Sequence, residues 1–203
     1  IIITETWLCD KIRNEELLLS NYNIYRADRT INTSGKSRGG GVLVAVNKLF
    51  NSSCVFSGYN VESVFIKIQV NDLNLIVGGV YIPPTSDINI YRNHVADLES
   101  IFNQFPDFAY VIAGDFNLPQ LIWSNNSCTN TELMGSSRDY FDVINNTYSF
   151  LNLNQVNNIP NNRNVFLDLV FTNILDLQVS SAVDPIFAES YHHIPYSWSI
   201  FYI

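Results

Sequence analysis

One stretch, residues 110–119, constrains the fold of this chain more than any other. It begins as an apolar run, which is typical of a strand buried on both faces, and breaks at Gly114. Because side chains two residues apart in a strand share a face, we expect Asp115 and Asn117 to point the same way, with Phe116 turned into the core. Open α/β sheets place active sites at such strand ends. A polar turn without chemical function is the alternative.

The composition is that of a globular protein that builds a hydrophobic core. Of the 203 residues, 47% are hydrophobic and 15% are charged, unlike a disordered segment. No stretch approaches the roughly 20 apolar residues of a membrane span, so we expect no membrane partner. The cysteines Cys9, Cys54 and Cys128 are widely spaced without a CxxC pair, which indicates reduced thiols in an intracellular protein and no zinc site.

The net charge of −8 bears on the class of substrate. It counts against tight binding of nucleic acid by the whole surface, because phosphate contacts from Lys and Arg dominate that affinity. It leaves open a phosphodiester substrate that is bridged by a metal ion, because carboxylates are the groups that hold Mg²⁺.

The order of predicted strands and helices favours two mixed sheets with helices outside. Alternating residues predict strands over Val61–Val70 and Leu73–Ile82, joined at Asn71-Asp72 by a link that resembles a hairpin turn. Helices are predicted where an apolar stripe runs from Tyr91 to Phe105, and again over Ser137–Ser149. Because strands outnumber helices and hairpins mix with helical crossovers, the fold class is α/β (α+β).

Three successive glycines, Gly39–Gly41, precede another apolar strand pattern over residues 42–46. Neither a helix pattern nor Gly-Lys-Ser/Thr follows them, which disfavours a phosphate-binding P-loop. We expect instead that the backbone approaches another group closely at this point.

Several polar residues stand at strand ends or interrupt apolar strands. They are Glu5, Tyr81, Asp115 with Asn117, Asp168, and His192 or His193. Taken alone, Glu5 is equally well explained as a solvated loop residue and Tyr81 as part of the core. Asp168 is harder to dismiss, since a charged, unpaired carboxylate among apolar residues costs several kcal/mol. A histidine partner would satisfy it and fix the imidazole tautomer, and a structural pairing with the backbone is the alternative.

Together these residue types suit hydrolysis of a phosphodiester. Glu5 is a hard oxygen ligand for Mg²⁺, which neutralises charge on the phosphate and assists the leaving oxygen. Asp115 is placed to orient or deprotonate the attacking water. Donors to the phosphate oxygens as charge builds are Asn117, Tyr81 and an imidazolium.

An ordered series of short motifs resembles the endonuclease/exonuclease/phosphatase family. In chain order the motifs are Glu5-Thr6-Trp7-Leu8, Tyr25-Arg26-Ala27-Asp28-Arg29, Gly39-Gly40-Gly41-Val42, Val80-Tyr81-Ile82-Pro83-Pro84, Gly114-Asp115-Phe116-Asn117, Leu167-Asp168-Leu169-Val170 and Tyr191-His192. The sequence is most similar to the endonuclease domain of Jockey-like non-LTR retrotransposon polyproteins. The likeness runs through essentially the whole chain.

The resemblance implies a fold, a cofactor and partners. The fold is a DNase I-like, four-layer sandwich of two mixed β-sheets flanked by helices, related to apurinic/apyrimidinic endonucleases and pancreatic deoxyribonuclease. The cofactor is Mg²⁺, with Mn²⁺ as a substitute, the substrate is DNA, and the parent polyprotein carries a reverse transcriptase that acts in the nucleus. The implied roles are metal binding by Glu5, phosphate contact by Tyr81, positioning of water by Asp115 and Asn117, and orientation of His192 by Asp168.

The chain departs from the family pattern at three points. The family begins with a strand whose Asn completes the metal site, so we expect residues 1–203 to be a single domain that lacks this strand and nicks DNA poorly. Tyr191 stands where many members have Asp before the catalytic histidine, and Glu189 stands where some retrotransposon members carry an acid, a second metal ligand. Of the adjacent histidines we favour His192 over His193, because Tyr-His recurs in that group.

The leading hypothesis is therefore a Mg²⁺-dependent endonuclease that nicks target DNA for reverse transcription primed at the nick. A phosphatase of the same family, acting on an inositol phosphate or a sphingolipid, is one alternative. A decayed copy that folds without cutting is the other. The motifs at residues 25–29 and 167–170 favour the retrotransposon branch.

Overall fold

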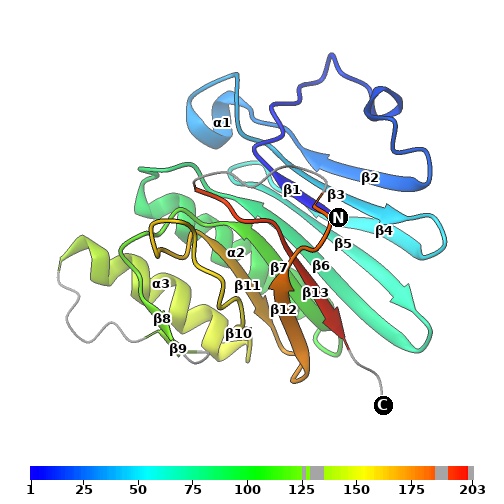
Figure 1. Cartoon of the computed structure of the whole chain (residues 1–203). Coiled ribbons are helices and arrows are strands. Elements are labelled where there is room, and N and C mark those ends of the chain that lie inside the picture. Colours follow the sequence, from blue (N-terminus) through cyan, green and yellow to red (C-terminus); the bar gives the residue numbers. More distant parts are fainter. Residues whose placement is uncertain (125–126, 129–134, 186–191, 201–203) are drawn as a thin grey trace.

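The computed structural model describes residues 1–124, 127–128, 135–185 and 192–200, and it consists of two β-sheets packed face to face (Figure 1). The two long helices, α2 (Ile88–Gln104) and α3 (Ser136–Phe150), cover the other face of the larger sheet. The predicted α/β class, two sheets packed together with helices outside, is confirmed, although the smaller sheet is antiparallel in the described part of the chain. No helix in the described part of the chain is long and apolar enough to cross a membrane.

The larger sheet has six strands, and β7 lies near its middle. Their spatial order is β10 (Asn154–Gln155), β11 (Asp168–Thr172), β7 (Ala109–Asp115), β6 (Leu73–Tyr81), β5 (Glu62–Val70) and β4 (Asn51–Ser57). Strands β6 and β7 are parallel and connected through α2, whereas the other pairs are antiparallel. Strands β5 and β6 form the predicted hairpin, and Asn71 in its turn has a φ of 53°.

The smaller sheet is antiparallel, and its strands come from the first quarter of the chain. Its spatial order is β1 (Ile2–Thr4), β3 (Val42–Asn47) and β2 (Tyr22–Ala27). The shorter elements are a ribbon of β12 (Leu177–Ser181) with β13 (Tyr196–Ile200), a pair of β8 (Trp123–Ser124) with β9 (Ser127–Cys128), and the single turns η1 (Asn14–Leu17) and α1 (Ile31–Ser34).

Alternation along β5 divides the interior into two hydrophobic cores. Val64, Ile66 and Ile68 point toward the smaller sheet, as their spacing predicts, and Phe65 points toward the helices. Both faces of the central strands are therefore buried, which accounts for their nearly continuous apolar sequences.

Helices α2 and α3 support the end of β7 from behind. His94 on α2 is fully buried, and its Nε2 lies 2.6 Å from the hydroxyl oxygen of Tyr148 on α3. The His94 ring meets Phe116 edge-to-face at 5.5 Å, and Tyr91 donates a hydrogen bond to the Phe116 carbonyl at 2.7 Å. Phe116 is thus fixed between the two polar residues that flank it, Asp115 and Asn117.

Burial lowers the pKa of His94 from 6.5 to about 4. The unfolded chain then takes up a proton that the folded protein resists, so the free energy of unfolding falls as the pH drops from about 6.5 to about 4. The loss from this one group is about 3 kcal/mol. Urea denaturation across this window measures it, with His94→Gln as the control that keeps a polar partner for Tyr148. Equal pH dependence in both proteins would contradict the assignment.

Candidate active site

The register of the larger sheet places four polar side chains at one level on neighbouring strands. Glu62 on β5 lies opposite Tyr81 on β6, and Tyr81 lies opposite Asp115 on β7. Asp115 in turn lies opposite Asp168 on β11. Because residues of one cross-strand row share a face, all four side chains lie on the face that packs against the smaller sheet. We refer to these four residues as the polar row.

Strand β7 ends at Asp115, next to an unusually close approach of backbone. Gly114 has a φ of 153°, and a Cβ added there would lie 1.8 Å from the carbonyl oxygen of Val80 on β6. Any other residue would push β6 and β7 apart. The glycine therefore fixes the distance between Tyr81 and Asp115, the next residues along the two strands.

Asp115 and Asn117 do meet, but through a turn and not through strand alternation as expected. The φ of Asn117 is 48°, a left-handed conformation that Asn adopts more readily than most residues. Its backbone N–H donates to Asp115 Oδ1 at 3.0 Å, and its Nδ2 donates to Asp115 Oδ2 at 2.7 Å and to the Ile82 carbonyl at 2.9 Å. Phe116 is turned into the helix-side core as predicted.

Asp168 has the histidine partner that its apolar surroundings predict, but the partner is His193. The Nδ1 of His193 lies 2.8 Å from Asp168 Oδ2, and its Nε2 lies 3.8 Å from Asp115 Oδ2. The expectation that His192 pairs with Asp168 is wrong. His192 is exposed, with its ring centroid 6.5 Å from that of His193. Adjacent side chains point in different directions, so only one of the two histidines reaches the row.

Charge is concentrated in this part of the molecule. Burial, followed by the negative charge of Asp168, raises the pKa of the almost fully buried Asp115 well above its usual range, against the effects of His193 and Asn117. The hydrogen bond to Asp168 raises the pKa of His193, against the effect of burial. An imidazolium at His193 is therefore held between two carboxyl groups at neutral pH.

Glu5 reaches the polar row from the smaller sheet. It follows β1 directly, is exposed, and accepts a hydrogen bond from the Tyr81 hydroxyl at 2.6 Å. Burial, and then this hydrogen bond, raises the pKa of Tyr81, so the phenol keeps the proton that it donates. The φ of Glu5 is 52°, a strained conformation for a residue with a long side chain. The structure thus brings Glu5 together with Tyr81, another of the predicted residues.

The site also includes two residues, Arg29 and Glu62, that were not among the site residues predicted from the sequence. Arg29 Nε donates to Glu62 Oε1 at 2.7 Å, and both side chains are buried. Glu62 could have been found, because counting back from the turn at Asn71-Asp72 places it opposite Tyr81. For Arg29 the only signal was its place in the motif at residues 25–29.

The donor set fits a magnesium ion that shares its ligands with substrate. Among the described residues, no group of three or more His, Cys, Asp or Glu side chains is arranged to hold a metal, and Glu189 lies outside those residues. In many enzymes that act on phosphate groups, Mg²⁺ is held through one or two carboxylates, waters and substrate phosphates. Glu5 offers an exposed carboxylate, and its hydrogen bond to Tyr81 places it next to the polar row, which carries the further acidic groups Asp115 and Asp168.

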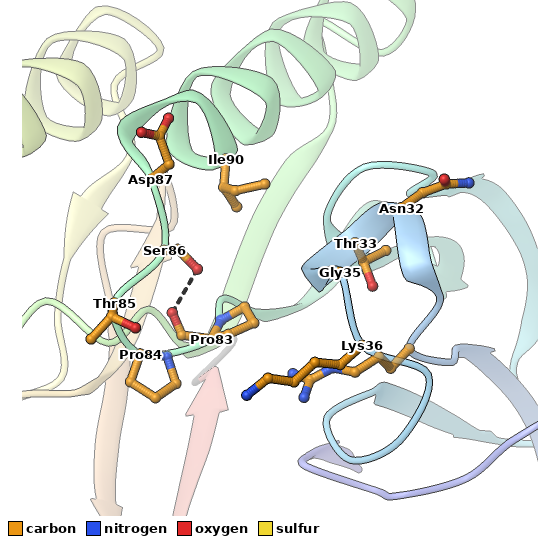
Figure 2. A pocket seen from close by; sticks show the side chains of 11 residues that line it. Asn32, Thr33, Gly35, Lys36, Pro83, Pro84, Thr85, Ser86, Asp87 and Ile90 are labelled. Atoms are coloured by element: carbon orange, nitrogen blue, oxygen red, sulfur yellow. Dashed lines mark hydrogen bonds between the residues drawn. The ribbon is translucent and has the colours of Figure 1, made fainter.

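A cavity of about 340 Å³ opens beside the row, between residues 29–36 and the loop that follows β6 (Figure 2). Arg29 and Lys36 are among its lining residues. Figure 2 shows Lys36 extending toward Pro83 and Pro84, and the Ser86 hydroxyl donates to the Pro83 carbonyl at 2.7 Å. The cavity therefore brings the Lys36 cation close to Tyr81, which lies two residues before Pro83. Asp87 also lines the cavity, and the charge of Arg29 is offset by Glu62.

Comparison with solved structures identifies the fold as that of the DNase I-like endonucleases. The endonuclease domain of TRAS1, a telomere-specific non-LTR retrotransposon, has a TM-score of 0.62 at 14% identity, covering 94% of this chain and 80% of that one. An AP endonuclease, LMAP from Leishmania major, has a TM-score of 0.65 at 11% identity, covering 96% and 76%. An AP endonuclease from Archaeoglobus fulgidus has a TM-score of 0.54 at 15% identity, covering 100% and 88%.

A family model that matches the sequence identifies the family of this chain. Residues 75–195 match the family model described as endonuclease-reverse transcriptase, and the chain belongs to that family. The resemblance to retrotransposon endonucleases of the endonuclease/exonuclease/phosphatase family, drawn above from short motifs, is confirmed. No curated protein matches the sequence significantly.

Because His193 is paired with Asp168, we expect its imidazole to titrate at an unusual pH. The His193 imidazole should lose its proton well above the ordinary histidine pKa of about 6.5, because Asp168 stabilises its charged form. Asp168→Asn should move that pKa down toward the ordinary value. NMR of the imidazole Cε1–H signals over a pH series measures both, with His192→Ala as the control that assigns the signals. An ordinary His193 pKa in the unmodified protein would contradict the pair.

Proposed function

We propose that this protein is a Mg²⁺-dependent endonuclease, with Mn²⁺ as a substitute ion, that hydrolyses DNA phosphodiester bonds. The observation that carries the proposal is the meeting of Asp115, Asn117, Asp168 and His193 at one strand end, with Glu5 and Tyr81 beside them. This is a water-positioning carboxylate next to several donors for a charged phosphate. Membership of the endonuclease-reverse transcriptase family supports it.

Each residue has a part that its contacts define. Asp115, held by Asn117 on one side and His193 on the other, orients the attacking water, and in its ionised form, made more basic by its raised pKa, it accepts the proton of that water. His193, kept charged by Asp168, donates to a phosphate oxygen as negative charge builds there. When bound at Glu5, Mg²⁺ would neutralise phosphate charge and assist the leaving oxygen. Tyr81 holds the Glu5 carboxylate and borders the phosphate.

Local charge reconciles a DNA substrate with the net charge of −8. Lys36 lines the cavity beside the polar row, where a phosphate of the strand being cut would lie (Figure 2), whereas the charge of Arg29 is offset by Glu62. Such contacts hold the backbone regardless of base sequence. Binding is then confined to this side of the molecule and is not spread over its whole surface.

We extend the proposal to the biological setting. Residues 1–203 would act as one endonuclease domain of a polyprotein that carries a reverse transcriptase, and would nick target DNA in the nucleus to prime reverse transcription. The name of the matching family and the solved endonuclease domain of the TRAS1 retrotransposon support this setting. A phosphatase of the same fold, acting on an inositol phosphate or a sphingolipid, is the alternative that the same site chemistry serves.

The experiment is Mg²⁺-dependent nicking of supercoiled plasmid by the unmodified protein and by Asp115→Asn. The substitution removes the basic group while preserving size, so the nicking rate should fall roughly 10²–10⁴-fold with an unchanged circular dichroism spectrum. Asp107→Asn is the matched control, because Asp107 is exposed at the opposite end of β7 and should leave the rate unchanged.

Three results would contradict the proposal. Wild-type nicking by Asp115→Asn would remove Asp115 from the site. Phosphate release from an inositol phosphate without plasmid nicking would favour the phosphatase. Absence of both activities in the folded protein would indicate a decayed copy.

A further inference from the structure

A buried ion pair lies directly behind Tyr81 and plays no part in the chemistry described above. The Glu62 carboxylate is fully buried and accepts hydrogen bonds from Arg29 Nε at 2.7 Å, from Thr33 Oγ1 at 3.0 Å and from the Gly41 backbone N–H at 2.5 Å. The Arg29 side chain is 8% exposed. Glu62 is thus the best-satisfied member of the polar row, and its partner Arg29 is fixed by it.

Burying this ion pair costs desolvation free energy, so its presence points to a role other than stabilising the fold. Desolvating two charges often costs as much as their attraction returns, so a buried ion pair is weak evidence for a stabilising role. The Arg29 Nη2 is also buried, and it has no hydrogen-bond partner within the described part of the chain. A buried donor left in this way calls for an explanation beyond stability.

Besides Glu62 and the Arg38 carbonyl, which accepts a hydrogen bond from Arg29 Nη1 at 3.4 Å, the Arg29 cation meets the ring of Tyr81. The guanidinium carbon lies over that ring, 5.5 Å from its centroid, which is within the range of a cation–π contact. The hydroxyl on the same ring, with which the Arg29 side chain also interacts, donates to Glu5 at 2.6 Å. A continuous series of contacts therefore runs from Glu62 through Arg29 and Tyr81 to Glu5, from the larger sheet to the smaller one.

The backbone of Gly39–Gly41 packs against this series of contacts. Gly40 has a φ of 58°, and a Cβ added there would lie 2.2 Å from Arg29 Nη2 and 2.4 Å from Glu62 Oε2. Only glycine allows the backbone to lie against the ion pair in this conformation. The close backbone approach expected from the sequence is confirmed, and the group approached is the Arg29–Glu62 pair.

We propose that Arg29, held by Glu62, is a positioning residue that fixes the Tyr81 ring so that its hydroxyl meets Glu5; this inference rests on the proposed nuclease function. Arg29 is suited to the task because its planar guanidinium bonds to a carboxylate at its edge while it stacks on an aromatic ring with its face. The Tyr81 ring is clamped at one side by this cation. Arg29 then affects turnover only through Tyr81, and it does not bind the DNA itself.

A double-mutant cycle on plasmid nicking tests this. Tyr81→Phe removes the hydrogen bond to Glu5 and should lower kcat roughly tenfold to a hundredfold, with KM for DNA little changed. Arg29→Met should lower kcat by no more than Tyr81→Phe does. In the Tyr81→Phe background, Arg29→Met should cause no further loss, because the group that it positions is already gone.

The matched control is Arg26→Met, a second largely buried arginine from the same region. Arg26 donates to the carbonyls of Cys9 and Ile12 and pairs with Asp28, without contact to the Tyr81 ring, so any loss that it causes should recur in full in the Tyr81→Phe background. If Arg29→Met does not fold, Arg29→Lys takes its place in the cycle, since Lys keeps the charge but not the planar fork.

The outcomes separate this inference from the function on which it rests. An equal loss of kcat by the Arg29 variant in both Tyr81 backgrounds would overturn it, as would a rise in KM, which indicates a direct contact with DNA. Failure of the proposed function looks different, because the unmodified protein would then not nick, or Asp115→Asn would nick equally well.

Discussion

The hydrogen-bond register of the larger sheet is the constraint on which the site depends. It aligns Glu62, Tyr81, Asp115 and Asp168 across four strands, although they come from distant parts of the sequence. A slip of one residue in any of these pairings would turn one polar side chain toward the helices and an apolar one toward the site. Gly114 and the short β5–β6 turn keep the register, so two local features control a long-range arrangement.

The position of the row between the sheets gives it its chemistry. The face that carries the row is otherwise apolar, so its carboxyl groups are held in surroundings that disfavour their charge. Partners offset this cost in two places, His193 for Asp168 and Arg29 for Glu62. Glu5 lies at the exposed rim, where a cation and a phosphate have access. Charged groups that weaken the fold are thus concentrated where negative charge must be bound and moved.

The sequence predicts those features that are local. The β5–β6 hairpin, the strand ending at Asp115, and the need of Asp168 for a partner all follow from periodicity or from the cost of burying charge. The choice between the histidines does not, because residues 192–195 belong to no strand with a register to count from. The left-handed turn at Asn117 and the Arg29–Glu62 pair depend on tertiary contacts. Strand β4 was missed because its largely exposed sequence lacks an apolar alternation.

The central claim is that the polar row and Glu5 form one site for a metal ion and a phosphate. The most direct measurement is a crystal structure with Mn²⁺ and a short DNA duplex, using the anomalous scattering of manganese to locate the ion. The account predicts an anomalous peak at the Glu5 carboxylate and a DNA phosphate within hydrogen-bond distance of Asn117 and His193. A manganese ion away from Glu5, with the DNA backbone bound elsewhere on the molecule, would contradict it.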